Sequence, residues 1–120
     1  MDNCTREELQ EALRVVASVI SRCEKMQPKF AAGTSQHTLL QNRLQALYIA
    51  ESLLKDENAA EYTKEDLGKA LPPLSSIISK CEKAQLKFTE GSSHHTRWQT
   101  MIKAMNLSKS QITDEISKRV

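Results

Sequence analysis

Apolar residues recur at intervals of three and four near the start of the chain, the spacing of one face of an amphipathic helix. The same spacing returns near the middle of the chain. The first face consists of Leu9, Leu13, Val16, Ile20 and Cys23, and the second of Leu67, Leu71, Leu74, Ile78 and Cys81. Thr5 precedes the first face and Thr63 the second, each with an acidic residue three positions later, as in a capping box. The pattern therefore predicts helices that begin just after Thr5 and Thr63.

A second apolar face follows a turn in each half of the chain. Gly33 and Gly91 mark the two turns, and hydroxyl residues directly after them are candidate N-caps. The candidate caps are Thr34 or Ser35 in the first half and Ser92 or Ser93 in the second. The apolar positions that follow are Leu40, Leu44, Leu47 and Leu54, then Trp98, Ile102, Met105 and Ile112. We therefore expect four helices arranged as two antiparallel hairpins.

Two interruptions of these helices are expected. Pro72 and Pro73 fall inside the third helix, where a proline costs about 3 kcal/mol relative to alanine. This predicts a short helix over residues 64–71 and a new one from about residue 73. The last helix is expected to break near residues 106–110, because its serines are plausible caps for a restarted helix.

The two halves of the chain repeat one another. Residues 5–54 align without a gap with residues 63–112 at an offset of 58, and 21 of the 50 positions are identical. Segment 18–38 matches its counterpart at 13 of 21 positions, whereas segment 39–54 matches at only 3 of 16. The repeat predicts an internal duplication in which the residues around the turn have been retained.

Two such hairpins predict an all-α fold, a pseudo-symmetric four-helix bundle formed by a single domain over residues 1–120. Because the helices would run up-down-up-down, the turns at 28–34 and 86–92 are expected at the same end of the bundle. The main alternative is exchange of hairpins between two copies, which would give a homo-oligomer.

Composition agrees with a helical protein and excludes several classes. Hydrophobic residues make up 39% of the chain, charged residues 27% and aromatic residues only 4%, as expected of an aliphatic helical core. The net charge of +2 is too balanced for a nucleic-acid-binding surface. We expect no membrane span and no signal peptide. Three cysteines without a C-x-x-C pair fit a reducing compartment, so a cytoplasmic location is expected.

Polar residues repeated around the two turns are the candidate binding residues. Lysines end the first helix of each hairpin, and hydroxyl residues with a histidine begin the second. The first copy is Lys25, Lys29, Ser35, His37 and Thr38, and the second is Lys83, Lys87, Ser93, His95 and Thr96. Ammonium groups, hydroxyls and the free amides of a helix N-terminus together favour an anion or a phosphate. Arg43 adds a guanidinium in the first half, where the second half has Met101, and Arg97 could substitute for it from a neighbouring position.

The same residues have other possible roles, in helix capping, metal binding or catalysis. Lysines at a helix C-terminus and hydroxyls at an N-cap stabilise a helix without any ligand. Cys23 and Cys81 could converge with His37 and His95 on a zinc ion, but the usual close-spaced ligand pair is missing. We therefore expect no metal and no cofactor. Because no nucleophile, base and orienting group can be named together, we expect no enzymatic activity.

The segment His37–Ala50 resembles uncharacterised small helical proteins of bacteria and their phages. It is also similar to the helical-hairpin domain of phage anti-defence sponges, which sequester cyclic nucleotide signals of the CBASS and Thoeris systems. The resemblance rests on Arg43, Leu44, Ala46, Leu47 and Ala50, of which the second half retains only the alanine at 104. It implies capture of a signalling nucleotide without implying which residues bind it.

The sequence thus predicts a non-enzymatic protein that captures an anionic small molecule, such as a signalling nucleotide, at its helix-turn ends. The alternative is an inhibitor or immunity-type bundle that binds a protein partner through an exposed apolar patch. The candidate residues of that patch are Leu39, Tyr48, Ile49 and Leu53.

Overall fold

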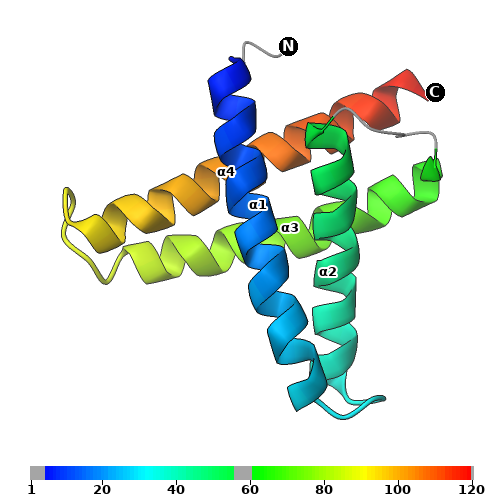
Figure 1. Ribbon diagram of the computed structural model, residues 1–120, viewed down its shortest axis with the longest axis horizontal. Coiled ribbons are helices and arrows are strands. Elements are labelled where there is room, and N and C mark those ends of the chain that lie inside the picture. Colours follow the sequence, from blue (N-terminus) through cyan, green and yellow to red (C-terminus); the bar gives the residue numbers. More distant parts are fainter. Residues whose placement is uncertain (1–4, 56–60, 120) are drawn as a thin grey trace.

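Four long helices account for most of the chain. The computed structural model describes residues 5–55 and 61–119. Its elements are α1 (Arg6–Met26), the short 3-10 helix η1 (Gln27–Lys29), α2 (Ser35–Leu54), α3 (Lys64–Gln85) and α4 (Ser93–Lys118) (Figure 1). The predicted all-α four-helix bundle is confirmed. Over the described residues, each helix is too short or too polar to span a membrane.

The two hairpins lie across one another. In Figure 1, α1 and α2 run transversely over α3 and α4, which form the layer behind them. The molecule accordingly measures 43 × 41 × 19 Å, with two long dimensions and a thickness of two helices. The α1–α2 turn lies at the end of one arm of this cross, and the α3–α4 turn at the end of another. The expectation that both turns lie at the same end is therefore wrong.

Alanine residues lie where helices of different hairpins meet. Ala46 of α2 and Ala70 of α3 line one groove, while Ala12 of α1 and Ala104 of α4 line another. All four are buried, with at most 3% of their surface exposed. A small side chain lets two helix axes approach closely, whereas a larger one would hold them apart. These positions explain why the hairpins can cross in direct contact.

One apolar core joins the two hairpins. Its fully buried members come from all four helices, for example Val16, Leu47, Leu74 and Met105, each without exposed surface. Val16 and Leu74 occupy equivalent repeat positions, as do Leu47 and Met105. Each hairpin therefore buries the same face against the other.

Two predicted helix breaks do not occur. Helix α3 runs continuously through Pro72 and Pro73. The residues on either side, Ala70 and Leu74, are both buried, and this continuous packing offsets the hydrogen bonds that the prolines cannot donate. Helix α4 also continues without a break, because Ser108 is buried and its Oγ donates to the Ala104 carbonyl oxygen at 2.9 Å. It satisfies its hydroxyl inside the helix and does not cap a new one.

The predicted helix starts are correct. The Glu8 amide donates to Thr5 Oγ1 and the Thr5 amide donates to Glu8 Oε1, both at 3.0 Å. The same reciprocal pair joins Thr63 and Asp66 at 3.0 Å. Each capping box satisfies two backbone donors at the start of the first helix of its hairpin. Most of the predicted linker, residues 56–60, lies outside the described residues.

We predict that Ala104→Leu destabilises the protein by about 1–3 kcal/mol, because the larger side chain overpacks the crossing of α1 and α4. Urea denaturation followed by circular dichroism measures the free energy of unfolding. Ala17→Leu is the matched control, since Ala17 is exposed on α1. Equal stability of the Ala104→Leu and Ala17→Leu variants would contradict the assigned role of the crossing alanines.

Candidate functional site

The two turns that were predicted to bind an anion have the same local structure. Gly33 has φ 91° and Gly91 has φ 93°, in the left-handed region that glycine adopts most easily. Thr34 then caps α2, accepting from the His37 amide at 3.2 Å, and Ser92 caps α4 in the same way through the His95 amide, also at 3.2 Å. Of the candidate caps, Ser35 and Ser93 are therefore excluded. Retention of these glycine and hydroxyl residues is explained by the turn itself.

Ten of the eleven predicted binding residues lie in two separate groups, one at each turn, whereas Arg43 lies farther along α2 and is partly buried. Four lysines, at positions 25, 29, 83 and 87, are exposed and form no ion pair with another described residue. Ser35, Ser93, Thr38 and Thr96 are also exposed, and the two histidines are partly buried. Because the turns lie on different arms of the cross, the two copies are not brought together (Figure 1). A single paired site at one end of the molecule is therefore not formed.

The second turn carries contacts that the first does not. The rings of Phe88 and His94 stack with centroids 4.8 Å apart. Gln85 Nε2 donates to Gln99 Oε1 at 2.7 Å and to the His95 carbonyl oxygen at 3.3 Å. The backbone of His95 is thus held by neighbouring residues, and the polar groups of this turn are partly occupied within the chain.

The two cysteines and two histidines of the alternative zinc site do not converge. Over the described residues, the structure contains no group of three or more His, Cys, Asp or Glu side chains able to hold a metal. Cys23 and Cys81 are 7% and 4% exposed and belong to the core. Burial raises the pKa of both thiols, and the nearby guanidinium groups of Arg22 and Arg43 only oppose this rise. Both thiols are therefore protonated at neutral pH and act as small core residues.

The apolar patch predicted for a protein partner is also not formed as expected. Ile49 has no exposed surface, so it belongs to the core. Tyr48 is half-buried and donates to Glu24 Oε2 at 2.5 Å, joining α2 to α1. This hydrogen bond raises the pKa of Tyr48 to about 12. Leu39 alone among the four candidates is exposed, with 49% of its surface accessible, and Leu53 is partly buried.

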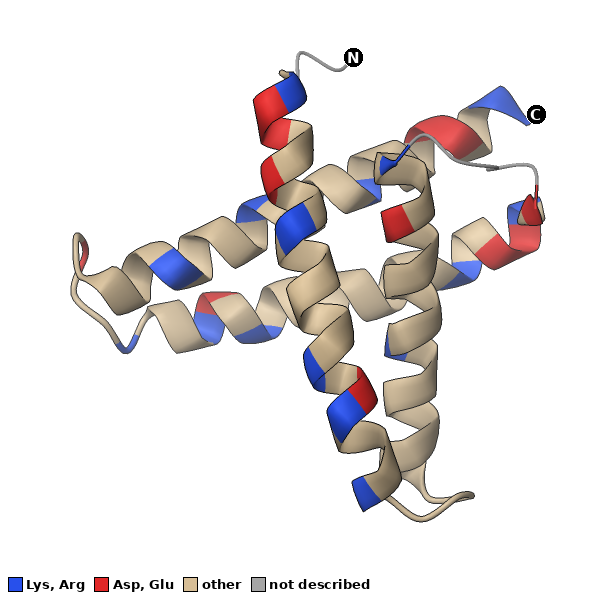
Figure 2. Cartoon of the chain, viewed as in Figure 1, with Lys and Arg blue, Asp and Glu red and all other residues tan. Residues whose placement is uncertain are grey.

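An arginine-lined groove lies between α1 and α4, and Arg97, which directly follows Thr96 of the second turn, is part of its lining. It encloses about 480 Å³, and the residues that line it include Arg14 and Arg22 from α1 and Arg97 from α4. Glu11 is the one acidic residue in its lining, so the lining has a formal charge of +2. Ser18 and Thr100 supply hydroxyl groups between the arginines. In Figure 2, basic residues follow the second half of α1, whereas its first turn is mainly acidic. The positive charge belongs to this groove and not to the whole crossing of α1 and α4, because a second groove between the same helices is lined by Glu7, Glu8 and Glu11 with Lys103 as its one basic residue.

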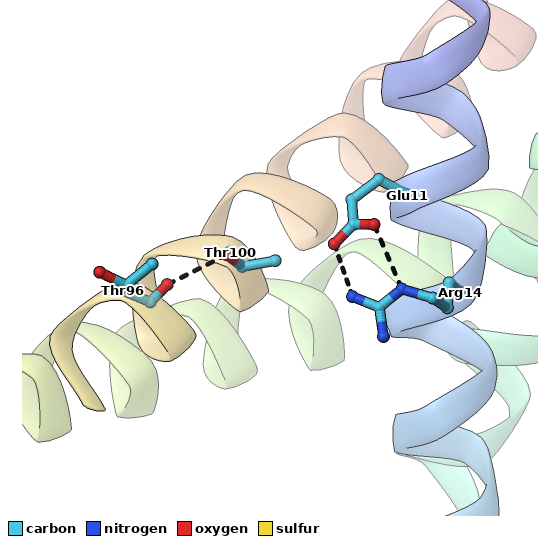
Figure 3. A network of polar contacts seen from close by, with 4 residues as sticks. All are labelled: Glu11, Arg14, Thr96 and Thr100. Atoms are coloured by element: carbon cyan, nitrogen blue, oxygen red, sulfur yellow. Dashed lines mark hydrogen bonds and ion pairs between the residues drawn. The ribbon is translucent and has the colours of Figure 1, made fainter. Parts of the chain in front are cut away.

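One of the three arginines is already paired. Arg14 Nη2 donates to Glu11 Oε2 at 2.6 Å and Arg14 Nε to Glu11 Oε1 at 3.2 Å, in a bidentate pair on α1. Figure 3 shows this pair reaching from α1 toward the side on which Thr96 and Thr100 lie on α4. The pairing lowers the pKa of Glu11 and raises that of Arg14. Arg22 and Arg97 form no ion pair with a described residue, so their charges are not compensated in this way.

A counterpart of this groove lies between α2 and α3. It encloses about 430 Å³, and six of its ten lining residues occupy repeat positions equivalent to lining residues of the first groove at the offset of 58. Leu39 stands where the first groove has Arg97, and Pro72 stands where it has Arg14. Ser76 matches Ser18, and Asn42 matches Thr100. The two grooves thus share a position in the fold and differ in charge.

Sequence reasoning based on the repeat missed the arginine-lined groove. It gave weight to residues retained in both halves, whereas Arg14 and Arg97 have no basic counterpart. The signal that could have found the groove is a difference between the repeats: basic residues of one repeat that align with apolar residues of the other. Recognising it required knowing that α1 and α4 cross.

No protein-family model, curated protein or solved structure matches this chain. The resemblance to small phage proteins therefore stays a prediction, and the function is argued from the geometry alone.

We predict that Gly91→Ala destabilises the protein by about 1–2 kcal/mol, because alanine resists the left-handed conformation of this turn. Gly68→Ala should have the opposite effect on stability. Gly68 lies inside α3 with open space where a Cβ would stand, so alanine there should stabilise the protein by about 0.5–1 kcal/mol. Thermal and urea denaturation measure both changes. A neutral Gly91→Ala variant would show that the turn does not require its glycine.

We also predict that Cys23 and Cys81 react slowly with iodoacetamide at pH 8 in the native protein, at least about tenfold more slowly than in guanidinium chloride, because the thiolate is the reactive form. Mass spectrometry of a Cys4→Ser variant follows these two thiols alone. Raised pKa values in the folded state mean that the protonated thiols stabilise the fold. This contribution is lost as the pH rises through those pKa values. Rapid native alkylation at either site would contradict burial of its thiol.

Proposed function

We propose that this protein is a non-enzymatic binding protein that captures an anionic small molecule in the groove between α1 and α4. The observation that carries the proposal is the grouping of Arg14, Arg22 and Arg97 around one groove with a single carboxylate. Guanidinium groups pair with phosphate and carboxylate oxygens through two parallel hydrogen bonds, so they favour such ligands over chloride.

The volume of the groove suits a small molecule. About 480 Å³ lies within the range of known ligand pockets, which extend from roughly 300 to 1,000 Å³. Val15 and Met101 give the groove an apolar part beside its arginines and hydroxyls. An anion with an apolar or aromatic moiety, as in a nucleotide, would use both parts of this lining.

The charge distribution supports a ligand at this groove in preference to the turns. At each turn the lysines are exposed and the helix amides nearest the cap are partly satisfied by Thr34 or Ser92. An exposed ammonium group is strongly hydrated, so its attraction for an anion is largely screened. The groove's arginines are exposed as well, but they line one hollow between two packed helices, and each guanidinium group offers parallel donors to an oxyanion.

Binding is tested by thermal-shift measurements and calorimetry with pyrophosphate and with linear and cyclic nucleotides. At least one of these probes should raise the melting temperature of the native chain. The Arg14→Ala/Arg97→Leu double variant should bind it at least about tenfold more weakly, because two charge-assisted contacts are lost. Leucine at 97 copies the counterpart residue Leu39, so the fold should tolerate it.

Two matched controls locate the site. Lys69→Ala removes the basic residue of the counterpart groove and should leave binding unchanged. His37→Ala/His95→Ala alters both turns and should also leave it unchanged. Loss of binding in the histidine variant with retention in the arginine variant would return the site to the turns. Lack of response to every anionic probe would refute anion capture as the function.

A further inference from the structure

Arg43 of α2 has buried nitrogen atoms that lack a hydrogen-bond partner. Its Nε and Nη2 atoms are the only buried side-chain polar atoms without a partner in the part of the chain that the structure describes. Arg43 as a whole is partly buried, but these two N–H groups have lost their hydration without gaining a hydrogen bond, which lowers stability. An acceptor from outside the described part of the chain would supply the hydrogen bonds that these two N–H groups lack.

The two nitrogen atoms form one edge of the guanidinium group. Nε–H and the adjacent Nη2–H point in the same direction and match the spacing of two oxygen atoms on a carboxylate or a phosphate. Other buried donors of the core are satisfied locally, as Ser108 is by the Ala104 carbonyl oxygen. The partnerless edge of Arg43 thus has the geometry that recognises an oxyanion.

Packing alone does not require an arginine at this position. The equivalent residue of the second repeat is Met101, which is 9% exposed and packs in the core. An apolar side chain of similar length therefore fits the equivalent place in the other hairpin. The charge at position 43 calls for a separate explanation.

A second arginine lies near the same place. The positive charges of Arg22 on α1 and Arg43 on α2 both act on the thiols of Cys23 and Cys81, opposing the effect of burial on their pKa values. Both positive charges therefore lie within electrostatic range of the two buried thiols.

The acidic groups that face this region do not neutralise it. Glu24 and Glu82 also act on the two thiols, but neither forms an ion pair with Arg22 or Arg43. Glu24 instead accepts the hydrogen bond from Tyr48 at 2.5 Å. Two arginines are thus left without a carboxylate partner among the described residues.

We propose that Arg43 is the centre of a second anion site, in which its buried edge holds a phosphate or carboxylate group and Arg22 contributes a further positive charge. This site goes beyond the groove described above, because Arg43 does not line that groove and lies on α2, a helix that contributes no residue to it. Arg22 is the residue that the two sites share.

The test compares the native chain with Arg43→Met, which introduces the residue of the other repeat. Inorganic phosphate and acetate are titrated separately against sodium chloride of equal ionic strength. Binding is followed through the side-chain Nε–H resonance of Arg43 in nitrogen-15 NMR spectra and through the melting temperature. We expect one of these anions to shift the resonance and raise the melting temperature, and the Arg43→Met variant to bind that anion at least about tenfold more weakly. The responding anion tells whether the site prefers a phosphate or a carboxylate.

The same variant should be more stable than the native chain in chloride alone, since it no longer buries a charge without a partner. Arg43→Lys, which keeps the charge but lacks the two-donor edge, should also lose most of the anion response. Arg97→Leu, which alters only the groove, should retain it. The site would be overturned if neither anion shifts the Arg43 Nε–H resonance. It would also be overturned if the anions raise the melting temperatures of the native and Arg43→Met chains equally. Neither outcome depends on whether the groove between α1 and α4 binds nucleotides.

Discussion

The crossing of the two hairpins is the constraint on which the rest of the structure depends. Neither hairpin can bury its apolar face alone, and the core is completed only when α1 meets α4 and α2 meets α3. Close approach at these crossings depends on alanines, while Val16, Leu47, Leu74 and Met105 fill the interior. Because the hairpins cross and do not run alongside one another, the bundle is only two helices thick. Grooves then form in the corners between the arms.

Much of the fold could be predicted from the sequence because its signals are local. Capping boxes, apolar periodicity and turn glycines each depend on residues within a few positions of one another. The angle between the hairpins depends instead on which faces meet and how closely, and this could not be inferred from periodicity. The predicted breaks at Pro72 and near Ser108 failed for a related reason. Burial of the surrounding helix face outweighed the local preference of these residues.

The candidate site was harder to predict than the fold. Retention in both repeats pointed to the turns, where Gly33, Gly91 and the two N-caps have structural roles that explain much of that retention. The grooves show the opposite pattern, since equivalent positions hold Arg97 in one repeat and Leu39 in the other. Arg43 and Met101 differ in the same way. In this chain the glycine and hydroxyl positions common to both repeats shape the turns, and the charged residues proposed here to bind an anion stand where the two repeats differ.

The arginine-lined groove is built from one helix of each hairpin, and this has a thermodynamic consequence. A ligand that contacts Arg22 on α1 and Arg97 on α4 binds only while the two helices remain crossed, so its binding free energy adds to that of hairpin association. Occupancy of the groove and the docked arrangement of the hairpins are therefore linked equilibria, and each shifts the other by the same free energy. The same linkage would hold if the crossing helices came from two different chains. Ligand binding in the groove would then report whether the two helices are associated, whether they belong to one chain or to two.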